Sequence, residues 1–216
     1  MRMAQHVAAW ANGGIEPVPI PYERLEWIES NGNQYCKLGF PFSYMKVDIT
    51  VEVTQEGSSD EFLVGSYDRG VYFLSGRLGS PGFVITPKKA KVGSRYRFFM
   101  DDEKVGYVYE DGVLLNTANN ISFLDQKNTM VFIFAGADTR SITTGPYGKK
   151  AGRIIELKTE ITEMSIAGRS THFVPVLDDA GIPCLFDVID METKLYNLGS
   201  GMFGYKKLDG TVVQPL

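Results

Sequence analysis

The chain has 216 residues, a formal net charge of −4 at pH 7 and a pI near 5.3; 44% of its residues are hydrophobic and 22% are charged. Single all-β domains commonly have roughly 200–250 residues, so this length fits one large sandwich that folds without a metal or disulfides. The acidic balance argues against a nucleic-acid partner, which requires a basic stripe to replace the counterions of its phosphates. The short basic runs at Lys88–Lys89 and Lys149–Lys150 are typical of solvated loops.

The N-terminal segment, residues 1–14, does not have the pattern of a signal peptide, because Gln5 and His6 interrupt its apolar residues. No run in the chain approaches the roughly 18 apolar residues that cross a bilayer. We therefore expect neither an export signal nor a membrane anchor. The same residues favour a short helix that ends at Gly13–Gly14.

Residues 15–21 alternate proline with other residues and are expected to be extended, because each proline disfavours the helical conformation in the residue before it. Residues 1–21 thus form an N-terminal arm ahead of a single domain over residues 22–216. An arm of this composition cannot fold alone and becomes ordered only when it docks. We therefore expect the arm to bind partner proteins of an assembly. Its apolar side chains Trp10, Ile15, Val18 and Ile20 would make the contacts.

After Tyr22 the hydrophobic pattern has a period of two residues, which is typical of β-strands. Apolar and polar residues alternate throughout Lys46–Thr54, which predicts a strand with one buried and one solvated face. Asp111–Gly112 is typical of a tight hairpin. Many short strands separated by Gly-containing turns predict an all-β, two-sheet antiparallel sandwich. Further strands are predicted at Glu61–Ser66, Gly70–Ser75, Gly82–Thr86, Ser94–Asp101, Lys104–Glu110, Val113–Asn116, Thr129–Ala135, Arg153–Ile166, His172–Val176, Leu185–Val188 and Leu195–Asn197.

The Gly-rich segment Gly136–Gly152 has low hydrophobicity and is predicted to be a long loop. Loops of such length are usually functional or mobile. Tyr147 lies near its centre, close to Lys149 and Lys150. We expect these three side chains to contact a partner protein or a glycan.

The two ends of the domain carry a specific pattern. Leu25–Tyr35 (LEWIESNGNQY) is followed by Leu38–Gly39, and Phe173–Asp187 (FVPVLDDAGIPCLFD) continues through Lys194–Phe203 (KLYNLGSGMF). These segments resemble the opening and closing patterns of concanavalin A-like (laminin-G-like) lectin/glucanase domains from phages, prophages and bacterial surface proteins. The resemblance implies a jelly-roll sandwich whose first and last strands lie near one another. Cys36–Lys37 departs from the pattern, and the arm is not part of it.

The resembled group includes glucanases, which use two carboxylates that flank the scissile bond. The nearest arrangement here is Asp187, Asp190 and Glu192, whose spacing fits a hairpin turn better than one face of a strand. His6 and His172 are too few for a histidine metal site, and a structural role is expected for His172. No catalytic residue, metal site or cofactor is therefore predicted.

Calcium is the alternative that the resemblance leaves open, because many lectin and laminin-G sandwiches bind it through loop carboxylates. The candidate ligands are Asp68, Asp178 and Asp179. The two cysteines, Cys36 and Cys184, have no metal-binding spacing, and free buried thiols are favoured over a disulfide.

Tyr107 and Tyr109 are two residues apart on a predicted strand, so their side chains should share one face. If that face is open, the two rings form a platform for the apolar faces of sugar rings, and we expect a glycan site there. The alternative is that both rings pack under loops.

These features favour a non-enzymatic, lectin-like binding and structural module of a bacteriophage virion. It would be a decoration or fibre protein on the capsid or tail, displayed for adhesion to glycans or host surfaces, and held to other virion proteins by its arm. A homotrimer is expected only by analogy with phage fibres. The alternatives are a bacterial carbohydrate-binding module at the cell surface and a glycoside hydrolase of the glucanase type.

Overall fold

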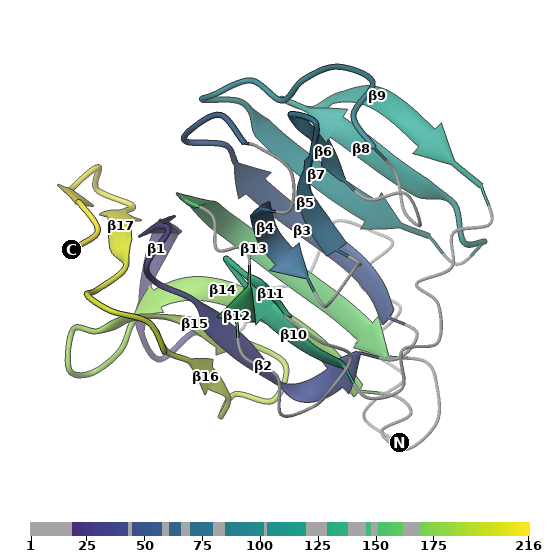
Figure 1. The fold of residues 1–216 in the computed structure, drawn as a ribbon. Helices are drawn as coiled ribbons and strands as arrows, with labels where there is room; N and C mark the ends of the chain where they lie inside the picture. The colour runs from purple at the N-terminus through teal and green to yellow at the C-terminus, as the bar shows by residue number, and fades with distance from the viewer. Residues whose placement is uncertain are drawn as a thin grey trace.

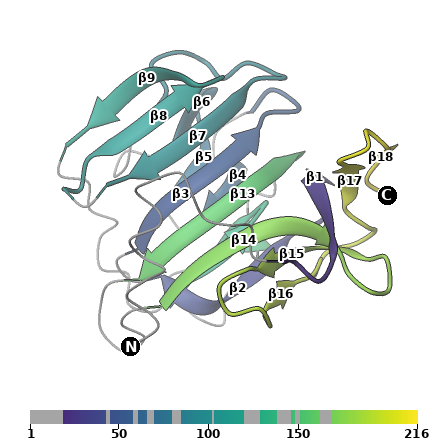
Figure 2. The same ribbon diagram turned by 180° about the vertical axis from the view of Figure 1, so that it is seen from behind.

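The computed structural model describes residues 19–42, 45–57, 61–65, 70–79, 85–101, 103–119, 129–137, 146–147, 151–161 and 169–216. These residues form β-strands joined by turns and short loops, and no helix occurs among them. The described part of the chain accordingly contains no helix that could cross a membrane. Two antiparallel sheets lie face to face (Figure 1), and the view from behind shows the broader sheet nearest the viewer (Figure 2).

The large sheet is 11-stranded, with the order β16-β15-β14-β1-β13-β3-β7-β8-β9 and the β17–β18 hairpin attached to β1. Strand β13 pairs with β1 along one part of its length and with β14 along another, so the sheet divides at this strand. The strands are β1 (Glu23–Asn31), β3 (Met45–Glu52), β7 (Arg95–Met100), β8 (Gly106–Glu110), β9 (Val113–Ala118), β13 (Ala151–Ile161), β14 (Arg169–Leu177), β15 (Pro183–Asp187), β16 (Lys194–Leu195), β17 (Gly204–Lys207) and β18 (Val212–Val213).

The small sheet is 5-stranded and has the order β2-β10-β4-β5-β6. Its strands are β2 (Cys36–Phe42), β4 (Glu61–Gly65), β5 (Gly70–Leu74), β6 (Arg77–Gly79) and β10 (Thr129–Ile133). A separate pair joins β11 (Gly136–Ala137) to β12 (Pro146–Tyr147). All pairings in the three sheets are antiparallel, as the alternating sequence pattern predicts.

The main hydrophobic core lies between the two sheets. On β3 the apolar residues, such as Ile49 and Val51, are fully buried, whereas Asp48 and Thr50 point to the opposite face and are only half-buried. The same alternation places Phe98 of β7 in the core. Apolar burial between the sheets is the dominant stabilising term for such a sandwich. The predicted all-β, two-sheet antiparallel sandwich is therefore confirmed.

The segment Gly136–Gly152 is not entirely a loop, so this prediction is wrong at both of its ends. Gly136 begins β11, which pairs with β12, and Gly152 lies within β13. A Cβ on Gly152 would lie 2.4 Å from Cδ2 of Leu63, and one on Gly136 would lie 2.8 Å from Cδ2 of Phe62. The glycines are therefore required for close packing of strands against core side chains. Because glycines lower the hydrophobicity of this segment, its sequence resembles that of a loop.

The first strand and the last hairpin close the sandwich at one side, where β1, β17 and the C-terminus lie together in Figure 1. A tight corner at Gly199 and Gly201 leads into β17. A Cβ on Gly199 would lie 1.9 Å from the carbonyl oxygen of Asn33, and Gly201 has a φ of +73°, which favours glycine. The nearness of the first and last strands, which the resemblance implies, is confirmed by the pairing of β1 with β17.

Gln34 joins three segments at this closure and is fully buried. Its Nε2 donates to the carbonyl oxygens of Leu216 at 2.6 Å and Ser200 at 3.1 Å, and its Oε1 accepts from the backbone N–H of Asn31 at 2.9 Å. The hydroxyl of Ser30 also lies 3.3 Å from Oε1. One side chain thus satisfies backbone groups from the start and the end of the domain.

The last residues of the predicted arm pack on the sandwich itself. Ile20 and Tyr22 cover a second apolar cluster on the far side of β14 and β15, and the Tyr22 and Phe186 rings meet edge to face at 5.0 Å. Trp10, Ile15 and Val18 lie outside the described residues. Ile20, a predicted anchor of the arm, therefore packs on the sheet of its own chain.

Both cysteines are free and buried, as predicted. Cys36 lies in the core between the sheets, and Cys184 lies in the cluster that Ile20 and Tyr22 cover. Burial raises the pKa of both thiols, that of Cys184 to about 12, so neither is a reactive thiolate at neutral pH.

Replacing Gln34 tests the closure. Gln34→Met keeps a similar volume but leaves the carbonyls of Leu216 and Ser200 and the N–H of Asn31 without this partner. We expect the free energy of unfolding, measured by denaturant titration, to fall by about 2–4 kcal/mol. The exposed neighbour Asn33→Ala is the control and should change it by less than about 0.5 kcal/mol. Equal effects of the two substitutions would show that Gln34 does not hold the closure.

Candidate functional site

The candidate site lies on the face of the large sheet that points away from the small sheet, here called the outer face. It carries the half-buried and exposed side chains of β13, β3, β7 and β8, which alternate with the core residues. Because the strands are in register, these side chains form rows across the sheet. From β13 towards β8, the rows are Lys158, Asp48, Phe99, Tyr107; then Glu156, Thr50, Arg97, Tyr109; then Arg153, Glu52, Arg95.

Four residues of the first two rows form what we call the aromatic patch: Arg97, Phe99, Tyr107 and Tyr109. The Phe99 and Tyr107 rings are stacked, with centroids 5.8 Å apart and planes 28° apart. The guanidinium carbon of Arg97 lies 5.4 Å from the centroid of Phe99, and Tyr109 lies opposite Arg97 on β8. The patch therefore combines flat apolar groups with polar edges.

Tyr107 is held at the edge of the patch by a turn. Its hydroxyl donates to Oδ2 of Asp101 at 2.9 Å, and the other carboxylate oxygen of Asp101 accepts from the backbone N–H groups of Glu103 and Val105. The bond to Asp101 raises the pKa of Tyr107, so its hydroxyl remains a hydrogen-bond donor at neutral pH. The hydrogen bond limits the rotation of the ring.

Arg97 and Asp48 form a two-pronged ion pair beside the aromatic rings. Nε and Nη2 of Arg97 donate to Oδ1 and Oδ2 of Asp48 at 2.8 and 2.7 Å. The hydrogen bonds to Asp48 raise the pKa of Arg97, which stays charged. The Arg97 side chain is 50% exposed and that of Asp48 is 14% exposed. The pair thus presents mainly its guanidinium edge to solvent.

Glu156 connects two basic side chains at the other end of the rows. Its Oε1 lies 2.6 Å from Nε2 of His172, and its Oε2 lies 3.1 Å from Nζ of Lys158. Burial raises the pKa of Glu156, but the hydrogen bond with His172 and the charge of Lys158 outweigh burial and lower it to about 2. His172 is therefore part of a structural network, in line with its predicted role.

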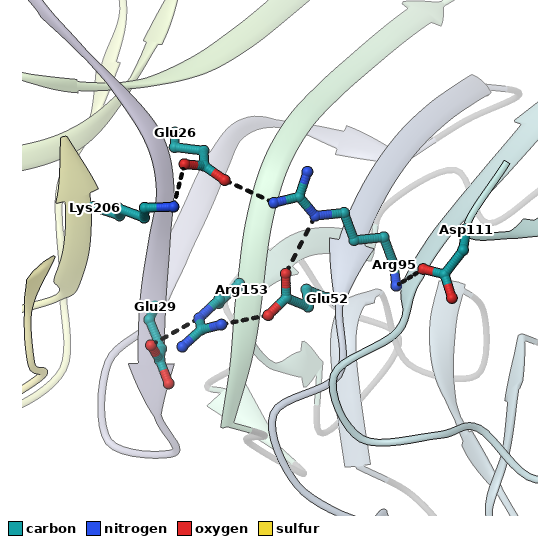
Figure 3. Close-up of polar contacts among 7 residues, drawn as sticks. All are labelled: Glu26, Glu29, Glu52, Arg95, Asp111, Arg153 and Lys206. Carbon is teal, nitrogen blue, oxygen red and sulfur yellow. Dashed lines mark hydrogen bonds and ion pairs between the residues drawn. The ribbon is translucent and has the colours of Figure 1, made fainter. Parts of the chain in front are cut away.

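The third row is part of a chain of alternating charges, which we call the charge ladder: Lys206, Glu26, Arg95, Glu52, Arg153 and Glu29 (Figure 3). It crosses β17, β1, β13, β3 and β7. Asp111, in the β8–β9 turn, accepts from the backbone N–H of Arg95 at 2.9 Å. The guanidinium of Arg153 also lies 4.1 Å from the ring centroid of Trp27. The contacts link neighbouring strands of the large sheet across its outer face.

Tyr107 and Tyr109 share the outer face, as their spacing predicts, and both are half-buried rather than covered. Tyr147 lies apart from them, on β12, where its backbone pairs with Gly136. Lys149 and Lys150 lie outside the described residues. The sequence prediction did not include Phe99 and Arg97, although their alternation with buried Tyr96, Phe98 and Met100 would have placed them on the outer face.

Three of the acidic residues considered for catalysis or calcium, Asp178, Asp187 and Asp190, accept hydrogen bonds from nearby backbone N–H groups. Asp187 is buried and accepts from the backbone N–H of His172 and Ile189, and Asp190 accepts from the N–H of Glu192 and Thr193. One carboxylate oxygen of Asp178 likewise accepts from the N–H of Ala180 and Ile182. Asp68 is outside the described residues. In the described part of the chain, no three His, Cys, Asp or Glu side chains are grouped so as to hold a metal ion.

The chain is similar to known proteins in its fold. No protein-family model matches the chain, and no curated protein matches its sequence. Among solved structures, the chain resembles that of "a putative carbohydrate binding protein from Bacteroides ovatus ATCC 8483", with a TM-score of 0.54 and 10% sequence identity over 88% of this chain. This chain spans 62% of that protein's length. At this identity the likeness shows an all-β sandwich fold.

The low pKa of Glu156 predicts a pH-dependent contribution to stability. Because its folded pKa of about 2 is below its ordinary value of 4.5, the contribution is present above pH 4.5 and lost as the pH falls towards 2. Between pH 5 and pH 2, the wild type should lose about 1–3 kcal/mol more unfolding free energy than Glu156→Gln. Denaturant unfolding at each pH measures this. The exposed Glu103→Gln serves as control, and the same flattening in that variant would contradict the assignment.

Proposed function

We propose that this chain is a non-enzymatic carbohydrate-binding module and that the aromatic patch is its binding site. The observation that carries the proposal is the stack of Arg97, Phe99 and Tyr107 beside Tyr109 on the outer face. Sugar sites need apolar faces for the C–H faces of pyranose rings and a few fixed polar groups for their hydroxyls. Here strand register fixes the apolar groups, and Asp48 and Asp101 fix the polar ones.

The fold supports this proposal. The chain is similar in fold to the solved structure of "a putative carbohydrate binding protein". This similarity agrees with the resemblance of Leu25–Tyr35 and Phe173–Phe203 to concanavalin A-like domains. We propose that the chain is a member of that group. Site chemistry rather than fold must then decide the function, since one sandwich architecture carries many activities.

Binding is favoured over hydrolysis because the carboxylates near the patch already have partners. Asp48 is paired with Arg97, Asp101 accepts the Tyr107 hydroxyl, and Glu156 contacts His172 and Lys158. A glycosidase also needs an acid of raised pKa, whereas the pKa of Glu156 is lowered to about 2. The described outer face therefore suits recognition of a sugar without cleavage of its bonds.

Glycan binding should depend on Tyr107 and Tyr109. Screening the purified chain on a glycan array should identify binding oligosaccharides, and titration calorimetry should show at least a tenfold loss of affinity in Tyr107→Ala and in Tyr109→Ala, or about 1.4 kcal/mol each. Tyr196→Ala is the matched control, because Tyr196 is also a solvent-accessible tyrosine whose hydroxyl donates to an aspartate carboxylate, that of Asp178. Its affinity should stay unchanged. Unaltered binding in both patch variants would place the site elsewhere.

We further propose, from the sequence alone, that the chain is displayed on a virion and tethered there by its N-terminal arm. Ile20 packs on its own sheet, so the tether would lie before it, in residues 1–18. Deleting residues 1–18 should leave the unfolding midpoint unchanged and abolish co-purification with assembled particles. Deleting residues 1–21 should also destabilise the domain, because it removes Ile20 from the apolar cluster on the far side of β14 and β15. Particle association that survives the shorter deletion would refute the tether.

A further inference from the structure

We infer that the aromatic patch selects uncharged glycans and that the Arg97–Asp48 pair sets this selectivity. The inference rests on the proposed carbohydrate-binding function and adds the class of sugar. Two features of the outer face support it. Its charges are balanced, and Arg97 can still donate hydrogen bonds while it is paired with Asp48.

The cations on the two strands at the patch, β7 and β13, already have carboxylate partners. Strands β7 and β13 carry four cationic residues, Arg95, Arg97, Arg153 and Lys158, and each contacts a carboxylate within 3.3 Å. An acidic sugar needs a cation to replace the water that it loses on binding. The described side chains of these strands provide no cation without a carboxylate partner, so a uronate or sialate would bind beside carboxylates.

The Arg97–Asp48 pair still has hydrogen-bonding capacity for hydroxyl groups. A guanidinium has five N–H donors, and Arg97 uses two on Asp48, which leaves three. The Arg97 side chain is half exposed and contacts the Phe99 ring. These donors therefore lie beside the apolar surface on which a pyranose would stack. A sugar hydroxyl can accept from Arg97 without bringing a charge.

The geometry of the Arg97–Asp48 pair is fixed. Two parallel hydrogen bonds to a carboxylate fix the plane of the guanidinium, and Asp48 is mostly shielded from solvent. Exchange of Asp48 for a ligand carboxylate would break both bonds and leave Asp48 desolvated beside a second anion. Uncharged sugars avoid this cost because they leave the pair intact.

The test compares matched oligosaccharides that differ only in charge: glucose- or galactose-containing chains and their glucuronate or galacturonate counterparts. The wild-type chain should bind at least one neutral oligosaccharide at least tenfold more tightly than its uronate counterpart in titration calorimetry at low salt. In D48N the guanidinium loses its counter-charge, so the ratio of neutral to uronate affinity should fall at least tenfold. In R97Q the uncompensated Asp48 should shift the ratio in the opposite direction.

Glu23→Gln is the matched control, because it also removes one negative charge from an ion pair, that with Lys207 at the β1–β17 side of the sheet. It should leave the ratio unchanged. Equal wild-type affinity for the neutral and uronate chains, or a D48N shift no larger than that of Glu23→Gln, would overturn the selectivity while leaving carbohydrate binding intact. Absence of binding to every glycan would refute carbohydrate binding itself. If D48N does not fold, the direction of the R97Q shift decides.

Discussion

The register of β13, β3, β7 and β8 is the constraint on which both the core and the outer face depend. Each strand alternates an inward apolar side chain with an outward polar or aromatic one, as with Phe98 between Arg97 and Phe99. A slip of one residue would exchange the two faces, burying Arg97 and exposing Phe98. Core packing therefore fixes the positions of the outer-face side chains. The burial of apolar residues in the core thus also sets the geometry of the candidate site.

The outer face is stabilised in a different way. It carries many charged side chains that are partly buried. Ion pairs between neighbouring strands offset the free-energy cost of this burial. Glu52 is only 8% exposed, yet it contacts both Arg95 and Arg153. Removing one member of such a chain leaves its neighbours desolvated without a partner, which costs more than the pair contributes. The same compensation at Arg97 and Asp48 leaves donors available for hydroxyl groups.

Much of the fold could be predicted from the sequence, because alternation is local information. Lys46–Thr54 and Asp111–Gly112 predict a strand and a hairpin that are present. Tyr107 and Tyr109 were placed on one face for the same reason. The contact of Phe99 with Tyr107 could not be predicted from spacing within one strand, because it depends on the β7–β8 register. The packing of Ile20 on β14 and β15 could not be predicted either, because these strands lie far from Ile20 in the sequence.

The closure of β1 against β17 has a kinetic consequence. Leu25 pairs with Lys207, and Gln34 bonds to Leu216, a separation of 182 residues along the chain. Contacts so distant in sequence are entropically costly to form and slow folding. On a ribosome, β1 leaves the exit tunnel long before its partner is translated. Until then its edge is open to pairing with other strands, which favours aggregation of the nascent chain.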